Sequence, residues 1–136
     1  MAAHPWWKTV GIATALAGAA ACGGSNSSPT SPGSGSGSPG TSGATITISA
    51  AGAVSPASVT INSGESVTFV NNHSAAHQIA SNPHPAHTDC PAVNALGTVN
   101  AGQTKLTDAL TTARSCGFHD HNDPSNTSLQ GTITVR

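Results

Sequence analysis

Apolar and polar residues alternate with a period of two in several short segments after residue 44. Residues 45–49, 59–61, 67–69 and 132–135 each place Ile, Val or Phe at every second position, with Thr or Ser between them. Because successive side chains of a strand point to opposite faces, this alternation predicts half-buried β-strands. Turn residues separate the segments at 55–56, 62–64, 101–102 and 122–124. Short strands broken by turns predict an all-β domain, an antiparallel Greek-key sandwich or barrel.

The segment from Ser81 to Leu96 interrupts this pattern, because it contains Pro83, Pro85 and Pro91. Proline cannot donate a hydrogen bond to a neighbouring strand, so this segment is unsuited to the middle of a sheet. We predict a structured loop here, and loops of this length are usually functional.

The first 43 residues differ in composition from the rest. Residues 1–22 pass from His4 and Lys8 through an apolar run to Cys22, an order typical of a signal peptide and too short to predict a membrane-spanning helix. Cys22 after three alanines resembles a bacterial lipobox, which implies lipidation of that cysteine; simple secretion is the alternative. Residues 23–43 contain only Gly, Ser, Pro, Thr and Asn, which predicts a disordered tether with a root-mean-square span of ~25 Å. Residues 44–136 then form one domain.

Charge and motifs exclude several classes of function. Charged residues make up 7% of the chain and the formal net charge is -1, so no basic surface is expected to hold nucleic acid. No serine has the surroundings of a hydrolase nucleophile, and no Gly-rich phosphate loop follows a strand. We therefore do not predict an enzyme.

Histidine is the residue type that most needs an explanation. The chain has seven histidines but only four Lys and Arg together. Six histidines fall in the predicted domain: His73, His77, His84, His87, His119 and His121. Because imidazole is a common ligand of copper and zinc, their number predicts metal binding.

Two segments carry a resemblance to a known family. Residues 66–72 read SVTFVNN and are followed by His77. Residues 114–119 read RSCGFH, which we interpret as a strand that ends at Cys116, and a closing LQGTITV segment follows, so that the Cys116 thiolate and the His119 imidazole lie at one end of the sandwich. This order resembles the cupredoxin family of plastocyanin and azurin-like copper proteins, over residues 44–136. The resemblance implies a cupredoxin-like fold and one copper ion held by His77, Cys116 and His119. The donor types agree, since thiolate and imidazole together suit both Cu(I) and Cu(II).

The predicted domain departs from that family pattern near its end. It contains no methionine, and Leu129 stands where the resemblance places the axial methionine ligand, so this position would not coordinate. His121 lies five residues after Cys116 and is an alternative to His119, or an additional ligand.

Cys90 leaves two further alternatives open. In an oxidising compartment Cys90 and Cys116 would tend to form a disulfide, and Cys116 would then have no thiolate to offer a metal. His84, His87 and Cys90 also follow one another at three-residue spacing, a pattern suited to a second copper or zinc site that Asp89 or His121 would complete.

Three functions follow from these alternatives. The first is a monomeric electron carrier of the periplasm or outer surface, tethered through Cys22, cycling between Cu(I) and Cu(II) with redox partner proteins of the cell envelope. The second is a copper or zinc binding, storage or delivery module that uses a histidine cluster together with a Cys90–Cys116 disulfide. The third is a metal-free, disulfide-stapled interaction domain. In the copper-binding alternatives, an open position on the copper would leave room for catalysis.

Overall fold

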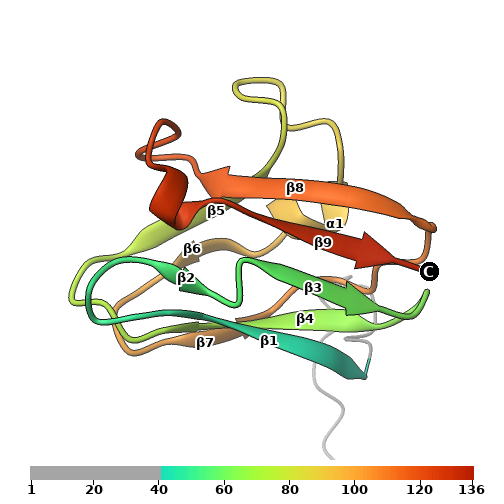
Figure 1. Cartoon of the computed structure of the whole chain (residues 1–136), viewed down its shortest axis with the longest axis horizontal. Helices are drawn as coiled ribbons and strands as arrows, with labels where there is room; N and C mark the ends of the chain where they lie inside the picture. The colour runs from blue at the N-terminus through green and yellow to red at the C-terminus, as the bar shows by residue number, and fades with distance from the viewer. Residues whose placement is uncertain (1–40) are drawn as a thin grey trace, which may run out of the picture. The chain divides into compact units, whose positions relative to one another are not determined.

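Residues 41–136 are described by a computed structural model, and they form two β-sheets packed face to face (Figure 1). The predicted signal peptide, the lipidation of Cys22 and most of the predicted tether lie outside these residues. Within this part of the chain, no helix has the length and apolar character needed to cross a membrane.

The first sheet has four strands in the order β2-β1-β4-β7. Their bounds are Val54–Ser55 for β2, Ser42–Ile48 for β1, Ser66–Asn71 for β4 and Thr104–Leu106 for β7. Strand β1 begins two residues before the predicted domain boundary, and the Ser42 hydroxyl lies 2.7 Å from the Thr68 hydroxyl on β4.

The second sheet has five strands in the order β3-β9-β8-β5-β6. Their bounds are Ser58–Ile61 for β3, Gly131–Val135 for β9, Arg114–Asp120 for β8, His77–Ser81 for β5 and Gly97–Val99 for β6. Strand β8 is at the centre of this sheet with β5 beside it; β8 carries His119 and β5 carries His77.

The predicted all-β sandwich is confirmed, but its strands are not wholly antiparallel. Strand β1 pairs with β4, and β3 with β9, in parallel. The reason is that the chain crosses to the second sheet at β3 and returns to the first at β4, so that β4 arrives beside β1 running in the same direction. All other strand pairs are antiparallel.

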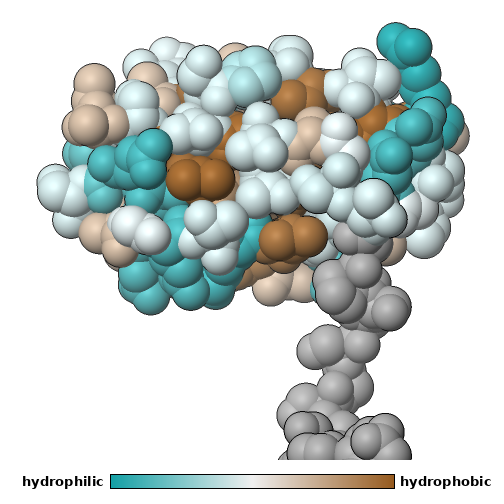
Figure 2. Space-filling view, turned by 90° about the horizontal axis from the view of Figure 1, so that it is seen from below, coloured by the Kyte–Doolittle hydropathy of each residue, from teal (hydrophilic) through white to brown (hydrophobic). Residues whose placement is uncertain are grey.

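Aliphatic residues and two phenylalanines fill the space between the sheets. Phe69 on β4 meets Phe118 on β8 edge to face, with ring centroids 5.3 Å apart. Ile46 and Ile48 are fully buried, as their alternation with threonines predicted. The face seen in Figure 2 shows apolar residues as separate patches between polar ones. Among the described residues, the large apolar side chain left exposed is Leu106.

Strand β8 continues well beyond the point where the sequence led us to end it. We expected the strand to stop at Cys116, but it runs on to Asp120. Cys116 and Phe118 are fully buried in the core, so they point to the inner face. Because side chains alternate along a strand, Gly117 and His119 belong to the outer face.

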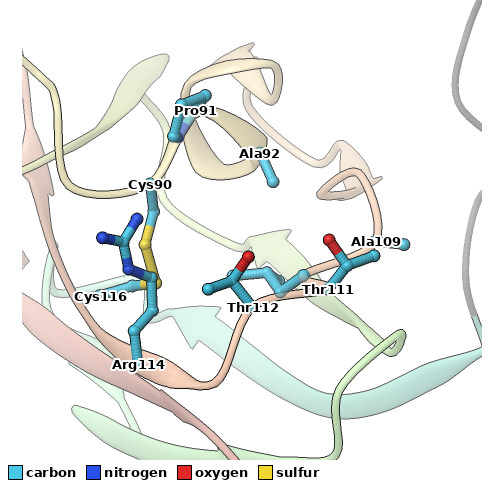
Figure 3. A pocket seen from close by; sticks show the side chains of 9 residues that line it. Cys90, Pro91, Ala92, Ala109, Thr111, Thr112, Arg114 and Cys116 are labelled. Atoms are coloured by element: carbon cyan, nitrogen blue, oxygen red, sulfur yellow. A yellow bond between two sulfur atoms is a disulfide. The ribbon is translucent and has the colours of Figure 1, made fainter.

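The proline-rich segment forms the predicted loop, which ends in a short helix, α1, at Pro91–Asn94. The loop at residues 82–90 stands out from the β5–β8 sheet on the side away from the other sheet (Figure 1). Cys90 at its end is joined to Cys116 on β8 by a disulfide. Figure 3 shows this disulfide bordering a pocket, with Arg114 beside it. Arg114 also donates a hydrogen bond to the Asp89 carbonyl.

We expect the disulfide to stabilise the domain mainly by restricting its unfolded state. The two cysteines are 26 residues apart, and closing a loop of this length is worth about 3.5 kcal/mol in the chain-entropy model. Replacing both cysteines, Cys90→Ala with Cys116→Ala, should therefore lower the free energy of unfolding by about 3 kcal/mol in urea titrations. An unchanged unfolding midpoint in the double variant would contradict this role.

Candidate metal centre

Four imidazoles converge on the outer face of the second sheet. They are His84 and His87 from the loop at 82–90, His119 from β8, and His121 directly after β8. One ring nitrogen from each lies within 4.8 Å of those of the other three. We call these residues the four-histidine cluster. It joins two segments that are more than 30 residues apart in the sequence.

His119 is the most buried member of the cluster, with 2% of its surface exposed. Its Nδ1–H donates to Oδ1 of Asn82 at 2.8 Å. Its other ring nitrogen, Nε2, is buried without a hydrogen-bond partner among the described residues. An unpaired buried polar atom costs free energy, and such an atom facing other imidazoles is typical of a metal ligand.

Burial and the neighbouring histidines lower the pKa of His119 below its ordinary value of 6.5. Loss of water around the ring is the largest cause, followed by the charges of His87, His84 and His121; Asp120 acts in the opposite direction. His119 is therefore held in the neutral form, which is the form that binds a metal ion.

His87 has an unusual backbone conformation, with φ of 52°. Residues other than glycine rarely adopt this left-handed region, and such strain persists only where the surroundings impose it. Three hydrogen bonds impose it here: the His87 amide donates to the Pro83 carbonyl at 2.7 Å, its Nδ1–H donates to the Ser81 carbonyl at 2.9 Å, and its carbonyl accepts from Nδ2 of Asn94 at 2.7 Å. The imidazole of His87 is thus held in place by the backbone hydrogen bonds of this residue and by the hydrogen bond of its Nδ1.

The remaining two members lie nearer the solvent. Nδ1 of His121 lies 3.0 Å from Nε2 of His87. Because His87 donates its Nδ1–H to the Ser81 carbonyl, a neutral His87 accepts at Nε2 from the Nδ1–H of His121. The His84 ring is 5.2 Å from that of His121 and 5.5 Å from that of His119, measured between centroids. His84 is exposed and His121 partly exposed, so the cluster is open to solvent at this side.

His77 belongs to a different group of side chains, on the inner side of the sheet. Its Nδ1 donates to Oδ2 of Asp120 at 2.7 Å, and its Nε2 lies 2.8 Å from Nδ1 of His73. Oδ1 of Asp120 accepts from the amides of Gln78 and Asn122. Both ring nitrogens of His77 therefore have partners, and these contacts link β5 and β8 to the turn after β4.

The structure does not assemble the expected set of His77, Cys116 and His119. Cys116 is bonded to Cys90, so it has no thiolate, and it points to the core while His119 points outward. The reason is that β8 is regular through both positions, and residues three apart on a strand face opposite sides. Leu129, the expected axial position, lies in the 3-10 helix η1 at Thr127–Leu129 and packs in the core.

The structure also regroups the second expected site. His84 and His87 meet His119 and His121, whereas Cys90 is occupied by its disulfide and Asp89 lies outside the cluster. A signal in the sequence could have indicated this arrangement. His119 and His121 are two residues apart, which places them on one face if the strand direction continues through them.

The lowered pKa of His119 predicts how the stability of the metal-free protein depends on pH. A group whose pKa is lower in the folded than in the unfolded state stabilises the fold above the unfolded value, here 6.5, and this stabilisation is lost as pH falls toward the folded value. The free energy of unfolding should therefore decrease below pH 6.5, and less steeply in His119→Gln. Urea titrations at a series of pH values test this, with His73→Gln as control; an equal slope in His119→Gln would contradict it.

No protein-family model matches the sequence, and no curated protein matches it. Solved structures do match. A plastocyanin from Dryopteris crassirhizoma is 19% identical with a TM-score of 0.54, covering 68% of this chain and 99% of that one. A purple cupredoxin from Nitrosopumilus maritimus is 23% identical with a TM-score of 0.53 and the same coverage of both chains.

A variant of amicyanin solved in its Cu(I) form also matches, at 14% identity with a TM-score of 0.52, covering 69% of this chain and 82% of that one. These neighbours are too distant in sequence to carry over individual residues. The described part of this chain therefore has the cupredoxin fold.

Proposed function

We propose that the domain binds one copper ion through His84, His87, His119 and His121. The observation that carries this proposal is the buried Nε2 of His119, which has no hydrogen-bond partner within residues 41–136 and belongs to a group of four converging imidazoles. Imidazole nitrogens suit Cu(II) and Zn(II), and copper leads the series of divalent first-row metals in affinity. The cupredoxin fold of the copper protein amicyanin adds support for copper.

The donor set favours a binding, storage or delivery role over that of a blue copper carrier. With Cys116 in a disulfide, no thiolate is offered, and the ion would have nitrogen ligands alone. Protons compete with the metal for the same imidazole nitrogens, so the apparent affinity should fall as pH decreases.

Electron transfer is the second candidate function. The fold itself favours it, because plastocyanin is among the neighbours, with an oxidised form solved. A ligand set held by the Asn82 and Ser81 hydrogen bonds would also change little between oxidation states. A protein that retains its copper through repeated reduction and reoxidation would support this role with a redox partner protein, whereas loss of Cu(I) would support delivery.

We also propose that the domain acts outside the cytoplasm. A disulfide is typical of oxidising compartments such as the periplasm, and the signal-like segment ending at Cys22 agrees with export. A lipid on Cys22 and a tether over residues 23–41 would hold the domain near the membrane as a monomer.

Copper titration of matched histidine variants tests the site. Wild type should bind one equivalent of Cu(II), with weak visible absorption and no intense thiolate band. The double variant His84→Ala, His87→Ala should lose more than about 100-fold in affinity, since outer-shell changes alone already cost 10–100-fold. These two residues lie on the loop, so their replacement leaves the core intact.

His73→Ala is the matched control, because His73 lies outside the cluster. It should bind copper as wild type does. Undiminished one-to-one binding by the double loop variant, or no binding by wild type, would refute the proposed site, and an intense blue band would show that Cys116 is a ligand after all. Zn(II) titration under the same conditions measures the preference between the two metals.

A further inference from the structure

Asn82 is the first residue of the loop that carries His84 and His87, and it contacts β8 in two ways. Its backbone amide donates to the Gly117 carbonyl at 2.9 Å, and its side-chain Oδ1 accepts from Nδ1–H of His119 at 2.8 Å. Its own carbonyl accepts from the Asp89 amide at 2.8 Å. Asn82 thus connects both ends of the loop to the strand beneath.

Gly117 provides the space for this contact. It precedes Phe118 and lies on the same outer face of β8 as His119. A Cβ atom at position 117 would overlap Nδ2 of Asn82, so a larger residue would displace the asparagine side chain. A glycine within a strand often marks such a close approach.

The hydrogen bond to Asn82 decides which nitrogen of His119 is free. A neutral imidazole carries one N–H, and placing it on Nδ1 leaves the lone pair on Nε2, the buried atom for which the described part of the chain offers no partner. Metal-binding histidines usually donate their other N–H in this way, which fixes the tautomer and raises the basicity of the ligand. His87 shows the same pattern, with the Ser81 carbonyl as acceptor.

We propose that Asn82, seated over Gly117, is a positioning residue that fixes the Nδ1–H tautomer of His119 and thereby presents Nε2 to the ion. The effect of Asn82 on metal affinity rests on the proposed function. The effect of Asn82 on the His119 tautomer does not rest on that function, and it can be measured without metal.

Asn82→Leu and Asn82→Asp separate this role from a merely structural one. Asn82 is exposed, so in an alanine variant water would replace the amide oxygen. Leucine removes the acceptor and covers the position, whereas aspartate can only accept at both oxygens. All variants keep the backbone hydrogen bonds of residue 82. Asn126→Leu is the control, since Asn126 accepts from the Ser128 amide at the start of η1, outside the cluster.

The first measurement is nitrogen-15 NMR of the imidazoles in the metal-free protein near pH 7.5. Wild type, Asn82→Asp and the Asn126→Leu control should show His119 protonated on Nδ1. Asn82→Leu should shift the population toward the Nε2–H tautomer, and Gly117→Ala should do the same because it displaces Asn82. A wild-type His119 protonated on Nε2, or an unchanged tautomer in Asn82→Leu, would overturn the inference.

The second measurement is Cu(II) affinity. Asn82→Leu should bind about 10-fold more weakly than wild type, while Asn82→Asp should bind at least as tightly as wild type. Equal weakening in both variants would show a structural role only and overturn the inference. If wild-type protein binds no copper, the proposed function fails, and the tautomer of His119 still decides whether Asn82 has the positioning role.

Discussion

The regular alternation of side chains along β8 is the constraint on which the rest of the site depends. One strand sends Cys116, Phe118 and Asp120 to the inner side and His119 to the outer side. The inner residues form, in turn, the disulfide, the aromatic contact between the sheets, and the buried link to His77. The outer histidine meets the loop. The residues of β8 that stabilise the fold therefore lie on one face of the strand, and its member of the four-histidine cluster lies on the other face.

Much of the fold was predictable because it follows from local pattern. Threonines alternating with isoleucine or valine indicated β1 and β9, and the three prolines indicated the loop before α1. The parallel pairing of β1 with β4 was not predictable in this way, since it depends on where the chain crosses between sheets. Period-two patterns specify which face is buried, but not which strand becomes the neighbour.

The site was harder to predict, because its residues were individually recognised but the favoured set of His77, Cys116 and His119 differs from the four-histidine cluster of the structure. We interpreted residues 114–119 as a strand that ends at Cys116, and this placed the Cys116 thiol and the His119 imidazole together at one end of the sandwich. The strand continues to Asp120, so the two side chains diverge. The choice between thiolate and disulfide depended on the distance from Cys90 to Cys116, and spacing along the sequence does not contain that distance.

The loop at 82–90 is attached to β8 by a covalent bond at one end, and the four-histidine cluster lies at the same junction. An ion held there would form a second cross-link between the same two segments, and such a site would not be preformed in the unfolded chain. Its binding energy would therefore add to the folding energy, by about 2.7 kcal/mol when free metal exceeds the dissociation constant 100-fold. Reductants would then break the disulfide, and chelators would remove the ion, independently of each other. The loop would lose both cross-links to β8 only where both metal and oxidising conditions are lost.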